Sequence, residues 1–242
     1  MNTLKNKVAL VTGSAKGLGK EIAICLAENG VDVIVHYNKS KASANKVSKI
    51  INQLGRKSIA LRADLTIMTE VQDMFSQTYN KFKRIDILIN NVGNCIMKDI
   101  QDIDFNEWRY IIDTTINSTY LCCSTCLPYM RKNNYGRIIN IGDSESDKLS
   151  ASLKMTPYKI GKVGVTVLTK SLALSHAKNN ITVNQVSPGI MANSKFKPEL
   201  KKMPKKRYAE YKDVTNAVMF LLSPKSDYIT GANIIISGGW NL

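Results

Sequence analysis

The stretch Val8-Ala9-Leu10-Val11-Thr12-Gly13-Ser14-Ala15-Lys16-Gly17-Leu18-Gly19 decides the fold of this chain. Its first four residues form an apolar run of the length and composition typical of a buried strand. Three glycines follow, which let the backbone turn tightly, and an amphipathic helical pattern begins directly after them. Because the N-terminus of a helix presents unpaired N–H groups to an anion, the stretch predicts a strand, a turn and a helix that bind a pyrophosphate group.

The rest of the chain repeats this alternation of short apolar runs and longer amphipathic stretches. The predicted strands are Val8–Val11, Val31–Val35, Ser58–Leu61, Ile85–Ile89, Arg137–Ile141, Thr182–Val186 and Asn233–Ile236. The predicted helices are Leu18–Glu28, Lys41–Leu54, Met68–Phe82, Phe105–Met130, Tyr158–Lys178 and Asp213–Leu222. The pattern indicates the α/β class, with one Rossmann-type domain over residues 1–242 and a doubly wound parallel sheet of about seven strands. Helices are expected on both faces of that sheet, and ligands at the carboxyl ends of its strands.

The composition excludes several classes of protein. The chain has 242 residues, 44% of them hydrophobic, and its 34 Lys and Arg against 19 Asp and Glu give a net charge of +15. No stretch approaches the roughly 18 apolar residues that a membrane span needs, and the first apolar run is too short for a signal peptide. Five cysteines in irregular spacing fit a reducing compartment. We expect a cytoplasmic protein without a membrane partner.

Neither a metal nor a nucleic acid is expected to bind. The chain has two histidines, His36 and His176, so a zinc site lacks ligands. A basic charge alone would suit nucleic acid, but no zinc finger, basic helix or RNA-binding aromatic pattern accompanies it.

The second predicted strand runs into His36-Tyr37-Asn38-Lys39-Ser40. In dinucleotide-binding folds an acidic residue at this end binds the adenosine ribose and selects NAD, whereas a basic residue accommodates the 2′-phosphate of NADP. Asp32 lies at the opposite end of the strand, and Lys39 and Lys16 are placed to meet a phosphate. The sequence therefore predicts NADP(H) rather than NAD(H).

A second motif, Thr156-Pro157-Tyr158-Lys159-Ile160-Gly161-Lys162, carries the candidate chemistry. Thr156 is expected to cap a helix with Pro157 in its first turn. Tyr158 and Lys162 then lie one turn apart on the same face. A phenol with an unperturbed pKa of about 10 is a poor acid at neutral pH, but a nearby ammonium lowers that pKa. The pair predicts a tyrosine that exchanges a proton with a substrate.

Together these motifs resemble the short-chain dehydrogenase/reductase family over essentially the whole chain. The matching positions are Thr12–Gly19, Asp64, Asn90-Asn91-Val92-Gly93, Asn117, Tyr158, Lys162, Ser187-Pro188-Gly189, Tyr228–Gly231 and Ser237–Gly239. The resemblance implies that Tyr158 is the proton donor and that Lys162 holds the nicotinamide ribose and tunes Tyr158. It also implies that Asn117 supports a water-linked proton relay.

The same resemblance implies an NADP(H) site and an assembly. Asp64 would bind adenine, Asn90 would steady the cofactor side of the sheet, and the segment after Pro188 would contact nicotinamide. The expected cofactor-binding residues are Gly13, Ser14, Lys16, Gly17, Leu18, Gly19, Asn38, Lys39, Ser40, Asp64, Leu65, Asn90, Val92, Gly93, Tyr158, Lys162, Pro188, Gly189 and Ile190. The helices predicted over Phe105–Met130 and Tyr158–Lys178 would form subunit contacts in a homotetramer, with a homodimer as the alternative.

The position after the predicted fifth strand departs from the family pattern. The family usually has a serine there, whose hydroxyl bonds the substrate carbonyl, whereas this chain has Asp143. Ser144 or Ser146 is the alternative candidate for that role. An ionised carboxylate accepts hydrogen bonds and donates none, so Asp143 suits a substrate that presents N–H groups or an imine.

Chain-wide similarity is greatest to the 3-oxoacyl-(acyl-carrier-protein) reductases, which implies carbonyl reduction in fatty acid biosynthesis. A basic segment at about residues 190–212 is expected to be a lid that meets an anionic or carrier-bound acyl substrate. Its charged residues are Lys195, Lys197, Lys201, Lys202, Lys205, Lys206, Arg207, Lys212, Glu199 and Glu210. One alternative is a pteridine reductase-like enzyme that reduces an imine. The residues that resemble that subfamily are Lys16, His36–Ser40 and Asp143. The other is a cofactor-binding protein that has lost catalysis, which is suggested by Asp143 at the position of the family's serine.

Overall fold

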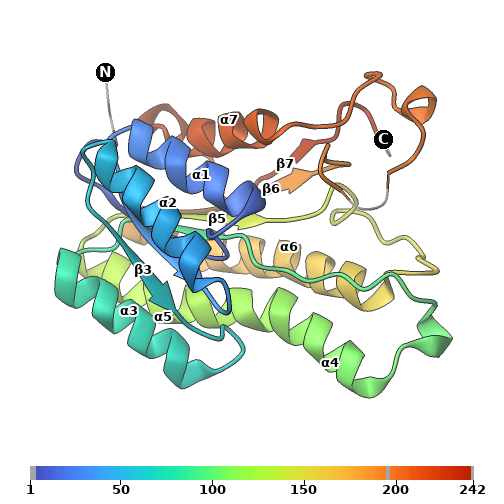
Figure 1. Cartoon of the computed structure of the whole chain (residues 1–242), viewed down its shortest axis with the longest axis horizontal. Coiled ribbons are helices and arrows are strands. Elements are labelled where there is room, and N and C mark those ends of the chain that lie inside the picture. The colour runs from blue at the N-terminus through green and yellow to red at the C-terminus, as the bar shows by residue number, and fades with distance from the viewer. Residues whose placement is uncertain (1–3, 195–196, 241–242) are drawn as a thin grey trace.

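A parallel sheet of seven strands forms the centre of the protein (Figure 1). The structure is a computed structural model that describes residues 4–194 and 197–240. The strands are β1 (Val8–Val11), β2 (Asp32–Tyr37), β3 (Ser58–Arg62), β4 (Ile87–Asn90), β5 (Gly136–Ile141), β6 (Ile181–Pro188) and β7 (Asn233–Ile236). Their spatial order is β3-β2-β1-β4-β5-β6-β7, and every neighbouring pair is parallel. The predicted doubly wound α/β fold is confirmed.

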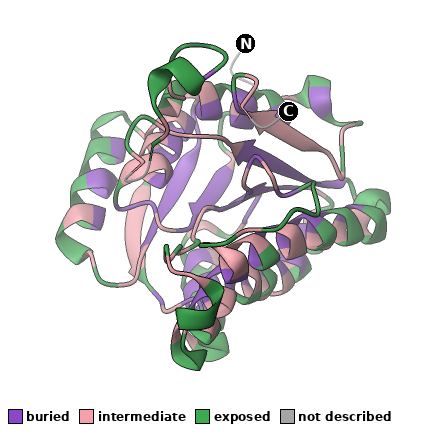
Figure 2. Cartoon of the chain, turned by 90° about the vertical axis from the view of Figure 1, so that its right-hand side faces the viewer, coloured by how far each residue is buried: buried purple, intermediate pink, exposed green. Residues whose placement is uncertain are grey.

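Helices cover both faces of this sheet, as predicted. They are α1 (Gly17–Glu28), α2 (Lys41–Gln53), α3 (Met68–Phe82), α4 (Phe105–Ile112), α5 (Ser118–Lys132), α6 (Thr156–His176) and α7 (Tyr211–Leu222). In Figure 1, α1, α2 and α7 lie on one side and α3 to α6 on the other. Alternate residues of a strand point to opposite faces, so Ala9 and Val11 join one buried apolar cluster while Val8 and Leu10 join the other. Figure 2 shows the resulting buried strands between helices whose outer surfaces are exposed.

The strand order reverses between β1 and β4, which are neighbours in the sheet. In an open α/β sheet, ligands bind in the crevice at the carboxyl ends of the strands where the order reverses. The glycine turn follows β1 and the Asn91–Gly93 segment follows β4, so the two candidate binding segments meet at this crevice.

One predicted helix is interrupted. In place of a continuous helix over Phe105–Met130, a π-helical turn at Asp113–Asn117 separates α4 from α5. The hydroxyl of Thr114 donates to the carbonyl of Tyr110 at 2.7 Å, and that of Ser118 to the carbonyl of Thr114 at 2.9 Å. Such side-chain bonds to the preceding turn compete with the regular backbone pattern and bend helices.

The expected cap of α6 is wrong. The helix begins at Thr156 itself, and Met155 in the capping position makes no side-chain bond. The Thr156 hydroxyl instead donates to the carbonyl of Ser152 at 2.8 Å. Pro157 lies in the first turn as expected, where its missing N–H has no helical partner to lose.

The segment 190–212 connects β6 to α7 and is fastened at its base. Met191 and Ala209 form an isolated parallel bridge, in which the N–H of Ala192 donates to the carbonyl of Ala209 at 2.8 Å. A short 3-10 turn at Leu200–Lys202 lies between them. Two residues of this segment, Lys195 and Phe196, lie outside the described residues.

Within residues 4–194 and 197–240, no helix combines the length and apolar character needed to cross a bilayer. The same part of the chain holds no cluster of three or more His, Cys, Asp or Glu side chains suited to a metal ion.

Candidate active site

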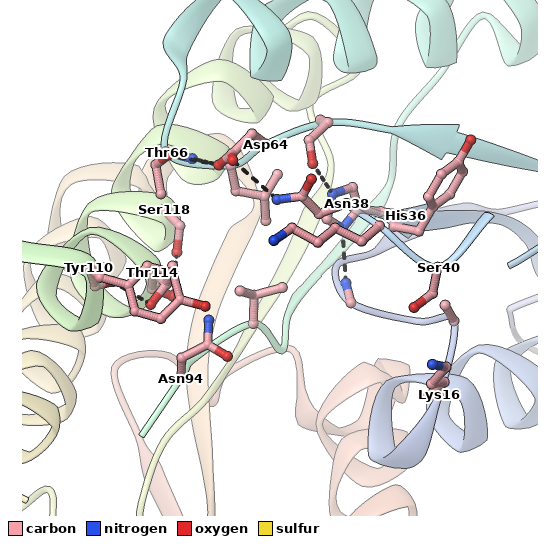
Figure 3. A pocket seen from close by; sticks show the side chains of 17 residues that line it. Lys16, His36, Asn38, Ser40, Asp64, Thr66, Asn94, Tyr110, Thr114 and Ser118 are labelled. Carbon is pink, nitrogen blue, oxygen red and sulfur yellow. Dashed lines mark hydrogen bonds between the residues drawn. The ribbon is translucent and has the colours of Figure 1, made fainter. Parts of the chain in front are cut away.

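A cavity of about 400 Å³, here named the β2 cavity, lies beside the ends of β1 to β4 (Figure 3). Eight of the predicted cofactor-binding residues line it: Gly13, Lys16, Asn38, Lys39, Ser40, Asp64, Leu65 and Val92. Its other lining residues, which sequence reasoning missed, are Ala15, His36, Tyr37, Ala63, Thr66, Asn94, Tyr110, Thr114 and Ser118. Tyr110, Thr114 and Ser118 project from the α4–α5 region, which only the tertiary fold brings to this wall.

Glycine is required at two positions of the turn. Gly13 has φ +61°, a left-handed conformation that residues with a Cβ rarely adopt. A Cβ on Gly19 would lie 2.6 Å from both the Gly13 carbonyl oxygen and the Asn91 amide nitrogen. The N-terminus of α1 can therefore approach the turn closely, which leaves its first N–H groups available to an anion.

Ser14 fastens the turn and lies outside the cavity lining. Its hydroxyl donates to the carbonyl of Val11 at 2.7 Å and accepts from the N–H of His36 at 3.1 Å. The side chain is fully buried. Ser14 therefore links the ends of β1 and β2, and its buried hydroxyl already donates its proton to Val11.

Asp64 is held in a defined orientation at the end of β3. Its carboxylate accepts from the Thr66 N–H at 3.0 Å, from the Thr66 hydroxyl at 2.7 Å and from the Asn38 amide at 3.1 Å (Figure 3). Burial opposes ionisation, but these bonds and nearby Arg62 lower the pKa of Asp64 below its ordinary value. The carboxylate is thus a fixed acceptor in the cavity wall.

The charges around the β2 cavity match the predicted pattern. Among the described residues that line it, Lys16 and Lys39 carry positive charge and Asp64 carries negative charge. Asp32 is remote, at the start of β2, and pairs with Arg56 at 2.7 Å. No acidic side chain follows β2 at the position where NAD-dependent folds place one.

A second, larger hollow of about 830 Å³, here named the Tyr158 cleft, lies across the glycine turn. The predicted residues that line it are Leu18, Gly93, Asp143, Tyr158, Lys162, Pro188, Gly189 and Ile190. The lining also includes Cys95, Met97, Met155, Met191, Ser194 and Pro198, which were not singled out in the sequence, together with Asn91 of the Asn90–Gly93 motif and Lys197 of the basic segment. Tyr158 and Lys162 of α6 thus share one cleft with the carboxyl end of β5, as their spacing predicted.

Lys162 is buried, with 4% of its surface exposed. Its ammonium donates to the carbonyl of Ile141 at 2.6 Å and lies 5.6 Å from the centre of the Tyr158 ring. Burial lowers the pKa of Lys162 to about 8, although nearby Asp143 acts in the opposite direction. A Cβ on Gly93 would lie 3.1 Å from the ammonium, so Gly93 gives the end of the Lys162 side chain room at this point.

The expected lowering of the pKa of Tyr158 is wrong for this structure. Burial of the phenol raises its pKa above the ordinary value, and the Asp143 carboxylate and Cys95 raise it further. A raised pKa favours the protonated phenol, which is the state a proton donor requires.

Asp143 is the one residue of the three candidates that reaches the Tyr158 cleft. It accepts the N–H of Glu145 at 3.0 Å, and burial raises its pKa although this bond and Lys162 oppose the shift. Ser144 is buried, and Ser146 accepts from the amide of Gln185 at 2.7 Å. Neither serine lines the Tyr158 cleft, which leaves Asp143 as the candidate for the role of the family's serine.

Asn117 does not reach the site. It is exposed, and its amide donates to the Asp113 carboxylate at 2.7 Å. The buried face of this turn carries Thr114 and Thr115 instead. Residues two apart on a helix point in nearly opposite directions. Because Thr115 faces inward, Asn117, two positions later, faces outward. The sequence signal that argues against Asn117 as a site residue is its position on the helix, on the face opposite the buried residues.

Asn90 lies within the sheet, away from both hollows. Its amide donates to the Asn140 side chain at 2.9 Å and so joins β4 to β5. The following residue, Asn91, lines the Tyr158 cleft, and its amide donates to the carbonyl of Thr12 at 3.0 Å. Asn90 therefore holds β4 and β5 together, and Asn91 holds the glycine turn.

The two hollows lie on either side of the glycine turn and the segment after β4. Gly13 and Val92 line the β2 cavity, and Leu18 and Gly93 line the Tyr158 cleft. An extended ligand can therefore cross the turn with one end in each hollow. The two adjoining hollows, with Lys16 and Lys39 in the lining of the β2 cavity, fit a dinucleotide.

A doubly wound sheet with this turn, and with a tyrosine and a lysine one helical turn apart in the adjoining cleft, defines an α/β oxidoreductase. The family described as "Enoyl-(Acyl carrier protein) reductase" matches residues 13–241. The chain belongs to the short-chain dehydrogenase/reductase family, whose members use a nicotinamide cofactor.

Relatives of the chain are similar over almost its full length. A 3-oxoacyl-[acyl-carrier-protein] reductase of Staphylococcus epidermidis is 36% identical over 97% of this chain and 98% of its own. Glucose 1-dehydrogenase 2 of Bacillus subtilis is 31% identical over 99% of this chain and 96% of its own. The crystal structure of a putative short-chain alcohol dehydrogenase from Sinorhizobium meliloti has a TM-score of 0.92 and 28% identity, over 99% of this chain and 98% of that one.

Proposed function

We propose that the protein is an NADPH-dependent reductase that transfers a hydride to the carbonyl of a 3-oxoacyl group held on a carrier. One observation carries the proposal: Tyr158 and buried Lys162 line an open cleft next to a glycine turn that can hold a pyrophosphate. The relative in Staphylococcus epidermidis, named as a 3-oxoacyl-[acyl-carrier-protein] reductase, supports this substrate class.

The chain's own residues bind the dinucleotide along the two hollows. The N-terminus of α1 receives the pyrophosphate, and Lys16 and Lys39 receive the 2′-phosphate. Asp64, with its fixed acceptor oxygens, binds the adenine side, and Lys162 holds the nicotinamide ribose beside Gly93. When bound, the cofactor supplies the hydride.

Tyr158 completes the reduction by donating its proton. The carbonyl carbon gains the hydride, the carbonyl oxygen gains the phenolic proton, and the tyrosine recovers a proton from solvent. Asp143 assists in its neutral form, because a protonated carboxyl has an O–H that donates to the carbonyl oxygen as a serine would. The raised pKa of Asp143 favours that neutral form.

The segment 190–212 acts as the lid of this site. Lys197 lines the Tyr158 cleft, its ammonium donates to the carbonyl of Ala192 at 3.0 Å, and it lies 5.1 Å from the Tyr208 ring centre. Two carboxylates of this region form ion pairs, Glu199 with Lys201 and Asp213 with Arg207. The remaining positive charge attracts an acidic carrier or another anionic group to the mouth of the cleft.

Steady-state kinetics test the proposal. Each candidate substrate is assayed with NADPH and with NADH. The substrates are acetoacetyl thioesters, a crotonyl thioester, a simple diketone, quinonoid dihydrobiopterin and glucose. We expect the largest kcat/KM with an acetoacetyl thioester and NADPH. Equal kcat/KM with NADH would contradict the cofactor assignment, and preferred turnover of another substrate would contradict the substrate class.

A pteridine reductase-like enzyme is the second candidate, and Asp143 is the observation that favours it. An ionised Asp143 in the cleft would accept an N–H of the substrate, and the reduced bond would be an imine. Preferred turnover of quinonoid dihydrobiopterin supports this candidate. Tight NADPH binding without turnover of any substrate supports instead a cofactor-binding protein that has lost catalysis.

A further inference from the structure

The ring of His36 uses both of its nitrogens within the wall of the β2 cavity (Figure 3). Nδ1 accepts from the N–H of Gly13 at 2.9 Å, and Nε2 lies 3.0 Å from the carbonyl oxygen of Ala63. An amide N–H only donates and a carbonyl oxygen only accepts, so the ring must be neutral, with its proton on Nε2. The two contacts therefore fix one tautomer.

The main chain of His36 binds the same turn. Its N–H donates to the Ser14 hydroxyl at 3.1 Å, and its carbonyl accepts the N–H of Ser14 at 3.1 Å. Ala63, at the other side of the ring, directly precedes Asp64, whose carboxylate is fixed by Thr66 and Asn38. One residue thus joins the glycine turn to the adenine side of the cavity.

These contacts also occupy the first two amides of the turn. The N–H groups of Gly13 and Ser14 already have His36 as their acceptor. A pyrophosphate must therefore be bound by the amides that follow, in the first turn of α1, which have no helical partners. Gly13 then contributes its left-handed backbone, and its amide serves to set the direction of that backbone.

The environment keeps the ring neutral. His36 is 2% exposed, and burial lowers its pKa to about 4 against the opposing effect of Asp64. The acceptor at Nδ1 is consequently present throughout the neutral range.

We propose that His36 is the positioning residue of the dinucleotide site. Its neutral ring holds the amide of Gly13, which preforms the turn for the pyrophosphate, and ties that turn to the segment that begins at Ala63. The inference rests on the proposed use of a dinucleotide cofactor.

Three variants separate the two ring contacts. In His36→Asn the side-chain oxygen occupies the place of Nδ1 and keeps an acceptor for Gly13. His36→Gln keeps a donor near the place of Nε2 and loses that acceptor, and His36→Phe loses both. The dissociation constant of NADPH is measured by fluorescence titration, and the melting temperature is recorded for each protein.

We expect His36→Phe and His36→Gln to weaken NADPH binding about tenfold or more, because the half-buried Gly13 amide loses its acceptor. His36→Asn should remain within about threefold of the unmodified protein, whatever its melting temperature. His176→Gln, which changes the other histidine at the remote end of α6, is the control and should bind as the unmodified protein does. Equal NADPH affinities for His36→Asn and His36→Gln would overturn the proposal.

The tautomer can be checked without any cofactor. With ¹⁵N-labelled histidine and the His176→Gln variant for assignment, we expect His36 to show the Nε2–H form from about pH 5 to about pH 8. An Nδ1–H form, or titration within that range, would overturn the proposal. If the unmodified protein binds neither NADPH nor NADH while the expected tautomer is seen, the proposed function fails instead.

Discussion

Burial and the Asp143 carboxylate together raise the pKa of Tyr158, while the ammonium of Lys162 donates to the carbonyl of Ile141. A negative charge beside a proton donor makes proton transfer to a carbonyl oxygen harder. For a ketone substrate, Asp143 therefore helps when neutral and hinders when ionised.

Replacing the carboxylate tests this directly. We expect Asp143→Ser to raise kcat/KM for an acetoacetyl thioester about tenfold at alkaline pH, the equivalent of one pKa unit on Tyr158. The exposed Asn117→Ala is the control and should change kcat less than about twofold. A loss of ketone reduction in Asp143→Ser would show that the carboxyl group itself takes part, and a large loss in Asn117→Ala would return that residue to the site.

The pH dependence of kcat/KM for NADPH should follow Lys162. Its pKa is lowered to about 8, so the cation is lost as the pH rises through that value, and kcat/KM should fall above it. Stability should change in the opposite direction. Between about 8 and the ordinary value of 10.5, the unfolded chain binds the extra proton, so this group favours folding increasingly as the pH rises.

Because kcat/KM should fall while the contribution of Lys162 to stability rises with pH, unfolding caused by this group cannot explain the loss of activity. Lys162→Arg keeps its charge at all accessible pH values, and its residual activity should lack the fall. A flat profile up to pH of about 9.5 in the unmodified protein would contradict the assignment.

At the scale of elements, the close approach of α1 to the glycine turn is the most sensitive contact of the site. A Cβ on Gly19 would lie 2.6 Å from the backbone oxygen of Gly13, which has no freedom to move aside. We expect Gly19→Ala to weaken NADPH binding more than tenfold and to lower stability by about 1–3 kcal/mol. Gly164→Ala is the matched control.

Gly164 is also a helical glycine, but an added Cβ there would meet the end of the Ile116 side chain, which can change rotamer. Its NADPH affinity should match that of the unmodified protein, as measured by titration beside Gly19→Ala. Similar affinities for both variants would show that the turn adapts to a larger residue.

The elements with a clear local pattern were predictable to the residue. β1 and α3 begin and end at the predicted positions, since their apolar residues follow one period from end to end. The π-helical turn at Asp113–Asn117 was not, because the residues before and after it share a helical pattern. The interruption depends on hydroxyl bonds that form only once the helix exists.

At the scale of the whole molecule, α6 has an apolar face without a partner in one chain. Ile160, Val167 and Leu174 are 48%, 59% and 86% exposed, and their spacing of seven places them on one face. We propose that this face joins subunits in a homotetramer or homodimer. The pair Val167→Asp with Leu174→Asp should therefore dissociate the assembly, because charged groups are costly to bury in an interface.

Light scattering at micromolar concentration measures the mass before and after the change. Leu54→Asp, which alters an apolar side chain 44% exposed at the end of α2, is the control and should leave the mass unchanged. A monomer mass for the unmodified protein would refute the proposal.

The candidate site was predictable only where its parts are close in sequence. Tyr158 and Lys162 are one helical turn apart, so their common cleft follows from the sequence. Cys95 comes from the loop after β4, whereas Met191 and Lys197 come from the segment between β6 and α7, and only the packed sheet brings these two loops to the same hollow. Asn117 shows the converse error, in which a matching residue type was chosen without regard to the helix face it occupies.

The bridge between Met191 and Ala209 closes a long surface loop at its base. Since its two ends are already fastened beside β6, the chain between them can gain or lose residues at a small cost in closure entropy and without moving the strands below. The loop between Met191 and Ala209, which forms part of the rim of the Tyr158 cleft, can therefore be replaced without changing the fold. Grafting a loop of another length or charge onto the same two anchors should alter which molecules enter, while the residues beneath keep their geometry.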